Sequence, residues 1–221
     1  MNKLPSKKPR FFVSETLEIS SWGNIKIYFE DLLNRELKSV SVLKSWLLDR
    51  SELDAVLEED MAWRYIKMCI DTKNKELSES FNFFIREISP NISLYNNKLD
   101  KKLHSSLYFK DLKEDKYKIY KRSLESSLSI FREKNVSLKS KMTEKEQEYG
   151  AICGQMTVEI DGEKMTMQKA GEIMKDNDRS KRESAYLKIW NRRIKDKDKL
   201  DSLFNDLISM RQEISNNADF S

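Results

Sequence analysis

Apolar residues recur along most of the chain in steps of three and four, the spacing that puts side chains on one face of an α-helix. The first series begins after Ser21 and consists of Trp22, Ile25, Phe29, Leu32, Leu33 and Leu37. A second, shorter series consists of Val40, Leu43, Trp46 and Leu47. These two series predict two separate amphipathic helices in the first fifty residues.

Helix start and stop signals divide the pattern further. A capping-box pair, Ser51 and Asp54, predicts that a new helix begins there and carries the apolar positions from Leu53 to Met68. The next apolar series runs from Leu77 to Ile88, and Pro90 is expected to end that helix because proline has no N–H and its ring clashes with the preceding turn.

Later segments continue the helical spacing. Leu99, Leu103 and Leu107 predict another helix, and residues 117–131 predict the next. Two further capping pairs start the remaining ones: Thr143–Glu146 opens a short helix that reaches Gly150, and Ser180–Glu183 caps a helix with Tyr186, Leu187, Trp190 and Ile194 on its apolar stripe. A last helix is predicted over residues 200–214.

One segment has a different period. Met156, Val158 and Ile160 alternate with polar residues, Asp161-Gly162 follows, and the alternation resumes at Met165 and Met167. Alternation on both sides of Asp-Gly is the strongest short-range signal for a β-hairpin. The fold class predicted is therefore all-α, mainly antiparallel helices, with one late β-hairpin around Asp161-Gly162.

Composition agrees with a helical protein. The 221 residues are 38% hydrophobic and 35% charged, with only 5 Gly and 3 Pro, and no constant repeat period is present. The domain organisation predicted is a loose arm over residues 1–14, a helical body over 15–150, and a hairpin followed by two long helices over 151–221, continuous with the body. No linker rich in Gly, Pro or Ser separates these parts, and a division into two subdomains at the turn near Gly150 stays open.

Charge excludes some classes of function. Lys and Arg number 41 and Asp and Glu 37, and the two signs are interleaved, whereas nucleic-acid-binding proteins concentrate basic groups on one face. The short basic clusters at 7–10 and 192–195 are interpreted as helix surface, so no nucleic acid is expected as a partner. We expect no signal peptide, no membrane-spanning segment, two reduced cysteines (Cys69 and Cys153) and a cytoplasmic location.

The residues that carry chemistry are sparse. The single histidine, His104, cannot make a zinc site of the His-Glu-x-x-His type, and we interpret it as a partly exposed helix residue. The acidic run Glu58-Glu59-Asp60 is interpreted as a solvated face, and Gly150, Gly154 and Gly162 do not form a phosphate-binding loop. The expected site inventory is therefore no catalytic residue, no metal ligand and an unknown substrate-binding set.

Several segments resemble the N-terminal half of oligoendopeptidase F-type zinc metallopeptidases, of the thimet-oligopeptidase superfamily. The strongest is EEDMAWRYIKMCIDT at 58–72. Shorter ones follow in the family's order: FIREISP at 84–90, IFREKNV at 130–136, EYGAICGQMTV at 148–158, DRSKRE at 178–183 and LDSLFNDLI at 200–208. Together they cover nearly the whole chain from about Ser21.

This resemblance implies a cytosolic zinc endopeptidase that cuts oligopeptides, in which the helical N-terminal region forms one wall of a substrate channel and restricts access to short peptides. The zinc-binding helix belongs to a later catalytic domain, which is absent from this sequence, so no zinc is expected in this chain. The expected partners are that catalytic domain and an oligopeptide substrate, and self-association of the chain without its catalytic domain stays open.

An alternative from another class is a free-standing helical module that binds a protein or peptide in a groove. Exposed apolar surface distinguishes the two hypotheses, because a peptidase part is expected to present a large patch for its catalytic domain. Trp63, Tyr65 and Tyr149 suggest peptide binding, but their helical spacing favours core packing, so no substrate residue is assigned.

Overall fold

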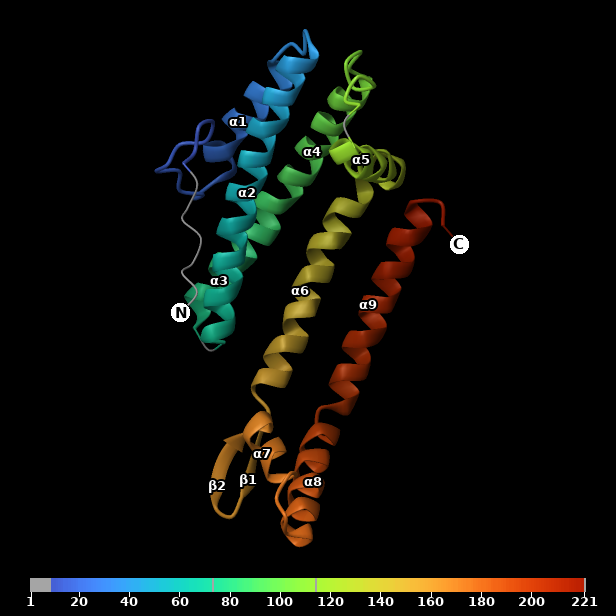
Figure 1. Cartoon of the computed structure of the whole chain (residues 1–221). Coiled ribbons are helices and arrows are strands. Elements are labelled where there is room, and N and C mark those ends of the chain that lie inside the picture. The colour runs from blue at the N-terminus through green and yellow to red at the C-terminus, as the bar shows by residue number, and fades with distance from the viewer. Residues whose placement is uncertain (1–8, 73, 114, 221) are drawn as a thin grey trace. The chain divides into compact units, whose positions relative to one another are not determined.

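The computed structural model describes residues 9–72, 74–113 and 115–220. Helices make up nearly all of the regular structure, and a two-stranded antiparallel sheet appears late in the chain (Figure 1). The predicted fold class is confirmed. The chain divides between Ser140 and Lys141 into two compact units, and we describe each unit by itself.

The first unit begins with α1 (Trp22–Asn34) and the long α2 (Val40–Ile70). It continues with α3 (Lys75–Phe83), a π-helical turn η1 (Phe84–Ile88), α4 (Ser89–Ser105), a 3₁₀ turn η2 (Asp115–Tyr117) and α5 (Lys118–Ile130). The last helix to start in this unit, α6 (Lys134–Gly154), continues into the second unit. Residues 1–8 of the predicted arm lie outside the described residues.

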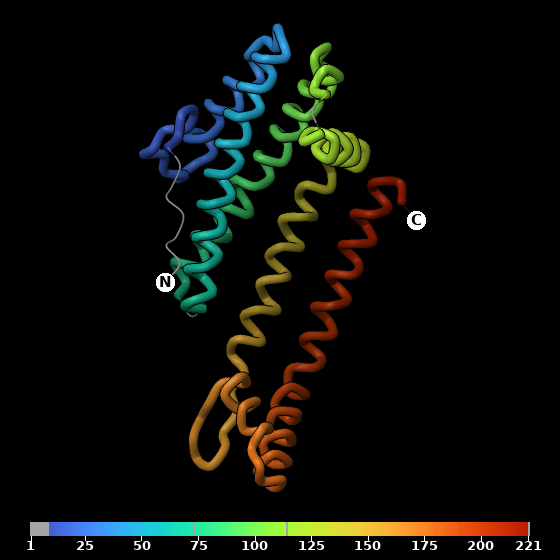
Figure 2. Tube along the Cα trace, viewed as in Figure 1, coloured from blue at the N-terminus to red at the C-terminus, as the bar shows by residue number. Residues whose placement is uncertain are grey.

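The predicted helix start at Ser51 is wrong, because α2 runs without a break through that residue (Figure 2). Its N-cap is Ser39, whose side chain accepts a hydrogen bond from the backbone N–H of Val42. No Gly or Pro lies between Val40 and Ile70. Since nothing in that stretch interrupts the backbone hydrogen bonds, a Ser with a carboxylate three residues later is not sufficient to start a new helix.

Pro90 does not end a helix as predicted. It lies in the first turn of α4, directly after the π-helical turn η1. A proline is tolerated there because the first N–H groups of a helix have no acceptor within that helix. The wider π turn η1 joins α3 directly to α4, so helical backbone continues from Lys75 to Ser105.

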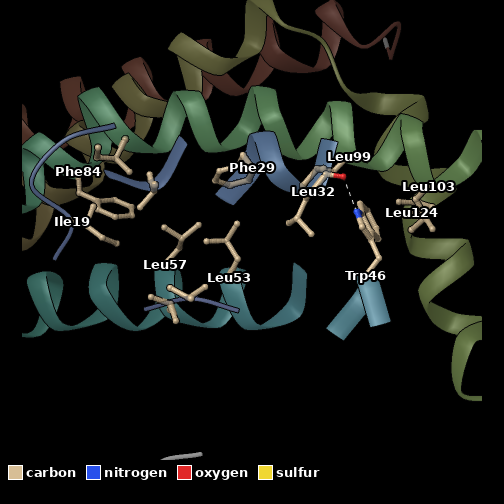
Figure 3. Close-up of a cluster of buried hydrophobic side chains, with 14 of the residues drawn as sticks. Ile19, Phe29, Leu32, Trp46, Leu53, Leu57, Phe84, Leu99, Leu103 and Leu124 are labelled. Atoms are coloured by element: carbon tan, nitrogen blue, oxygen red, sulfur yellow. Dashed lines mark hydrogen bonds between the residues drawn. The ribbon is translucent and has the colours of Figure 1, made fainter. Parts of the chain in front are cut away.

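The core of the first unit takes buried side chains from α1, α2, α3, η1, α4 and α5 and from the loop segments that contain Val13, Ile19 and Phe109 (Figure 3). Its largest side chain is Trp46, which is 1% exposed and donates its indole N–H to the carbonyl oxygen of Leu32 at 2.8 Å. Helix α4 adds Leu99 and Leu103, both fully buried. Leu107, which was predicted to continue this stripe, lies beyond the end of α4 and is exposed.

The second unit contains the hairpin. Strands β1 (Thr157–Ile160) and β2 (Glu163–Thr166) pair antiparallel, with Val158 opposite Met165 and Ile160 opposite Glu163. Asp161 and Gly162 both have positive φ, 54° and 80°, as a two-residue turn of the mirror-image type requires. The predicted hairpin is confirmed, except that Met167 starts a helix instead of ending the second strand.

Three helices follow the hairpin: α7 (Met167–Ile173), α8 (Arg179–Ile194) and α9 (Lys197–Asn217). The cap of α8 is Asp178, not Ser180, because the Asp178 carboxylate accepts the N–H of Ser180. Thr143 does not start a short helix either, since it lies inside α6. Two small apolar clusters hold the unit together: one around Ala170, Ala185 and Ile189, the other around Ile152, Leu203 and Leu207.

Candidate functional site

The C-terminal half of α2 presents apolar side chains to solvent. Trp63, Ile66 and Ile70 follow each other in steps of three and four, and they are 55%, 41% and 80% exposed. Tyr65 is also exposed, although its ring contacts Phe81. The prediction that Trp63 and Tyr65 pack in the core is therefore wrong. Met61 and Met68 of the same stretch still pack against the core, so the exposed residues lie on another face of α2, and a helix with apolar residues on two faces does not show by spacing alone which face is buried.

Helices α8 and α9 each have two different apolar faces. In α8, Ala185 and Ile189 are buried against the hairpin cluster, whereas Tyr186 and Trp190, which directly follow them, are exposed. In α9, the buried Leu203 and Leu207 are likewise each followed by an exposed residue. We call these exposed residues the outer apolar face of the second unit: Tyr186, Leu187, Trp190, Ile194, Phe204 and Ile208.

Tyr149 is a third departure from the predicted core, since it is 57% exposed on α6. A hydrogen bond to the Cys153 thiol one turn later raises the pKa of its phenol. Exposed apolar residues that gather in a patch commonly mark a contact site for another molecule. The arrangement is suited to contact with another apolar surface.

A cavity of about 690 Å³ lies in the first unit between α2, α4 and α5. Its wall includes Arg50 and Asp54 from α2, Asp100 from α4 and Tyr120 from α5. Arg50 Nη2 donates to Asp100 Oδ1 at 2.6 Å. The sequence interpretation did not single out these residues, because α2 and α4 are far apart along the chain.

The residues present do not fit a catalytic zinc. Such a site takes about three protein ligands from His, Cys, Asp or Glu, and the described residues include no group of three that lie close enough to hold a metal. His104 is exposed on α4 with its ring against Phe109, as expected of a surface helix residue. In the run Glu58-Glu59-Asp60, both glutamates are exposed and Asp60 is bonded to Arg64.

A helix that crosses a membrane has to be both long and apolar. Among the helices of the described ranges, none combines the length and the apolar character that crossing a bilayer requires.

Comparison with known proteins gives the family. The sequence profile described as the peptidase M3 N-terminal domain matches residues 12–131, which are 120 of the 221 residues. The chain belongs to the peptidase M3 N-terminal domain family. The resemblance to oligoendopeptidase F-type peptidases is thereby confirmed for this part of the sequence, and the match ends just after α5.

Solved structures extend the likeness beyond the peptidase M3 N-terminal domain. A candidate oligoendopeptidase F from Bacillus anthracis is 19% identical, with a TM-score of 0.82 over 96% of this chain and 40% of its own. PZ peptidase A with an inhibitor is 19% identical, with a TM-score of 0.83 over 95% and 38%. At this identity the likeness establishes the fold. The chain spans less than half the length of each of these structures.

No curated protein matches the sequence.

Proposed function

We propose that this chain is the non-catalytic N-terminal part of a zinc-dependent oligopeptide endopeptidase, and that it forms one wall of the channel through which short peptides reach the active site. The observation that carries the proposal is the match to the peptidase M3 N-terminal domain. The fold of this chain also matches three longer solved chains named as oligoendopeptidase F or PZ peptidase, over 95% or more of this chain and 37–40% of theirs.

In this proposal the zinc ligands and the catalytic base come from the remaining part of the longer protein. The donor set of this chain supports that division of labour. The described residues include no group of three His, Cys, Asp or Glu side chains close enough together to hold a metal ion, whereas a catalytic zinc takes about three such ligands. We therefore assign no catalytic and no metal-binding residue to this chain.

The catalytic part docks, in this proposal, on the outer apolar face of the second unit. Exposure of an aromatic and aliphatic surface of this kind to water is unfavourable, and its burial stabilises the complex by roughly 25 cal/mol for each Å² removed from solvent. Trp190 and Tyr186 are about half exposed in the isolated chain, so they retain much of their area for such a contact. Aromatic residues of this kind commonly dominate the energetics of interfaces.

Restriction to short peptides follows from a channel with rigid helical walls. A folded protein has to unfold before it enters, which costs about 5–15 kcal/mol for an ordinary domain, whereas a short flexible peptide bears no such cost. We propose the cytoplasm as the compartment. The free thiols Cys69 and Cys153 fit a reducing environment.

The experiment that tests the proposal is to determine the coding sequence beyond the codon for Ser221. A reading frame that continues into a His-Glu-x-x-His segment is the expected result. A stop codon directly after Ser221 would contradict the proposal and would favour the alternative, a free-standing helical module that binds a protein or peptide.

A further inference from the structure

Positive charge is concentrated on α8 and the turn that follows it. Residues 179–199 contain nine basic side chains and three acidic ones, a net charge of +6, whereas the whole chain carries +4. All the other residues taken together are therefore slightly acidic. The two signs are interleaved along most of the sequence, so α8 is the helix on which one sign prevails.

Much of this charge is not neutralised within the second unit. Arg192 is bonded to Asp196 and Lys197 to Asp201. The other exposed basic side chains near the end of α8 and at its start form no ion pair with any described residue: Arg179, Lys188, Arg193, Lys195 and Lys199. An anionic group that approaches this side of the unit is therefore attracted to it.

Two of these cations lie in line with the aromatic residues of the outer apolar face. Residues 179, 183, 186, 190 and 193 follow each other in steps of four and three, so they share one side of the helix. All five are exposed, with Tyr186 at 53% and Trp190 at 50%. We call them the basic–aromatic stripe: Arg179, Glu183, Tyr186, Trp190 and Arg193.

The stripe continues toward α6 through Arg193. A hydrogen bond to the Cys153 thiol raises the pKa of the Tyr149 phenol, and the nearby charge of Arg193 opposes that shift. Tyr149 and Arg193 are both exposed although they come from different helices of this unit. The apolar and basic surface is therefore broader than α8 alone.

This composition favours a partner that carries both apolar groups and carboxylates. Burial of Tyr186 and Trp190 against an apolar surface is favourable. Arg179 and Arg193 at the ends of the stripe are covered by the same contact, and a buried guanidinium without an anionic acceptor is costly. A carboxylate meets that need, because it accepts two parallel N–H groups of an arginine.

A protein surface fits the stripe better than nucleic acid does. The half-exposed side chains of Leu187 and Ile194 lie beside the stripe. They offer no hydrogen bond to a phosphate or a sugar, which take most of the contacts in nucleic-acid complexes. Glu183, within the stripe, repels a phosphate backbone.

We propose that the basic–aromatic stripe docks an acidic, partly apolar segment of the remaining part of the longer protein. Carboxylates of that segment pair with Arg179 and Arg193, and its apolar side chains cover Tyr186 and Trp190. The inference rests on the proposed function, in which the catalytic part docks on the outer apolar face, and it specifies the charge of the surface that docks. Opposite charges also raise the rate of encounter and fix the orientation of docking.

Fluorescence anisotropy of labelled peptides with the 221-residue chain tests the charge of the partner. The probe is a synthetic peptide of about 20 residues with leucine at helical spacing and glutamate or alanine elsewhere, and the matched peptide has glutamine in place of each glutamate. We expect the glutamate peptide to bind about tenfold or more tightly than the glutamine peptide, and to weaken as salt is raised to about 0.5 M. Equal binding of the two peptides, or no binding of the glutamate peptide by folded protein, would overturn the proposal.

Two charge reversals give the matched comparison. Arg193→Glu should weaken binding of the glutamate peptide about tenfold or more. Lys188→Glu changes the net charge of the same helix by the same amount, but it lies about 140° around the helix from Arg193 and should weaken binding less than about threefold. Circular dichroism confirms that both variants fold. Equal effects of the two variants would show that net charge alone attracts the peptide and would overturn the assignment to the stripe.

Other anionic partners are separated by the same assay. Binding of phosphatidylglycerol vesicles or of single-stranded DNA in place of the glutamate peptide would assign the face to a lipid surface or to nucleic acid and would overturn the proposal. A stop codon directly after Ser221 would contradict the proposed function and with it the occupant named here. Loss of the preference for glutamate in a chain whose reading frame continues would contradict the acidic partner alone.

Discussion

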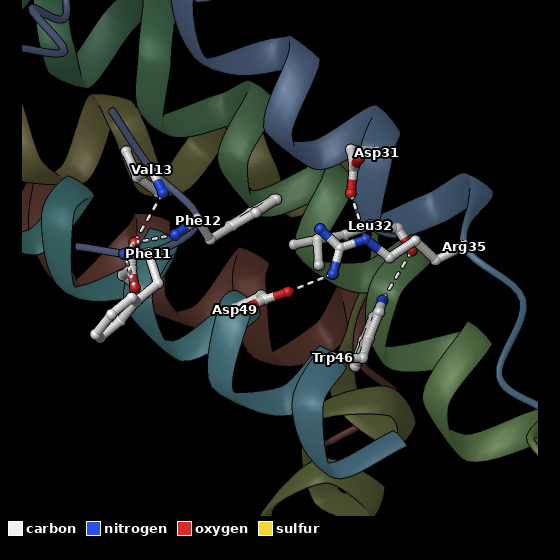
Figure 4. A network of polar contacts seen from close by, with 9 residues as sticks. Phe11, Phe12, Val13, Asp31, Leu32, Arg35, Trp46 and Asp49 are labelled. Carbon is white, nitrogen blue, oxygen red and sulfur yellow. Dashed lines mark hydrogen bonds and ion pairs between the residues drawn. The ribbon is translucent and has the colours of Figure 1, made fainter. Parts of the chain in front are cut away.

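Glu52 Oε1 accepts a hydrogen bond from the backbone N–H of Val13 at 2.7 Å (Figure 4). The same carboxylate accepts the N–H groups of Phe11 and Phe12 at 3.0 and 2.8 Å. A single side chain in the middle of α2 therefore attaches the segment that precedes α1. Val13 is buried in the core of the first unit, so this attachment also fixes an apolar contact.

This attachment predicts a dependence on pH. Partial burial acts to raise the pKa of Glu52, but the N–H groups of Val13, Phe11 and Phe12 outweigh it, and the pKa lies below its ordinary value. A lowered pKa in the folded state means that the contribution is complete above the unfolded value of about 4.3 and is lost as the pH falls through the folded value. The protection of the amides at residues 11–13, taken relative to their intrinsic exchange rate at each pH, should therefore fall below about pH 4.

Glu52→Gln should accelerate the same amide exchange at pH 7, because a neutral amide oxygen is a weaker acceptor than a carboxylate. We expect a loss of about 1 kcal/mol or less in the free energy of unfolding. Glu58→Gln, on the same helix but exposed, serves as the control and should change neither quantity. Unchanged exchange at residues 11–13 in Glu52→Gln would contradict the role assigned to this carboxylate.

Trp46→Phe should destabilise the first unit by about 2–3 kcal/mol. The change removes the hydrogen bond to the carbonyl of Leu32 and leaves a void in a core where Trp46 is 1% exposed. Urea unfolding measures the effect. Trp63→Phe, on the same helix at a 55% exposed position, should cost about 0.5 kcal/mol or less. Equal effects of the two substitutions would show that the burial described for Trp46 is wrong.

Gly162→Ala should destabilise the hairpin by about 1–2 kcal/mol, because φ at this position is +80° and a side chain is strained there. Gly171→Ala is the matched control. It lies in α7 with open space around its Cα, so the same change should be neutral or stabilise by up to about 1 kcal/mol. Thermal unfolding of both variants checks the difference in sign.

Trp190→Ser should reduce self-association of the chain. If the outer apolar face is a docking surface without its partner, copies of the chain are expected to associate through it at high concentration. Lys188→Ser, an exposed polar position on the same helix, should leave association unchanged. Sedimentation equilibrium measures both. A chain that stays monomeric at concentrations of about 100 μM would contradict the docking surface.

Local pattern was enough to predict the helical class and the hairpin, because the apolar spacing and Asp161-Gly162 act through neighbouring residues. Boundaries were predicted less well. Ser51 and Thr143 look like helix caps but lie inside longer helices, and Pro90 starts a helix instead of ending one. Such a residue caps a helix only where the residues before it are not themselves helical. A pattern of three or four residues does not show whether they are.

Burial and the cavity depend on contacts between distant segments. Trp46 and Trp63 lie on the same helix, yet Trp46 is buried and bonds to Leu32 of α1, whereas Trp63 is exposed. Likewise the ion pair of Arg50 forms only because α4 places Asp100 beside it. The sequence shows the charges of Arg50 and Asp54 but not that one donor is left buried without a partner.

The most direct test of the central claim is a peptidase assay of the purified 221-residue chain on a fluorogenic oligopeptide, with added zinc and with a chelator. The account predicts no cleavage above background in either condition and no stoichiometric zinc by elemental analysis. Chelator-sensitive cleavage by the pure chain would contradict it, because the active site would then lie within these residues.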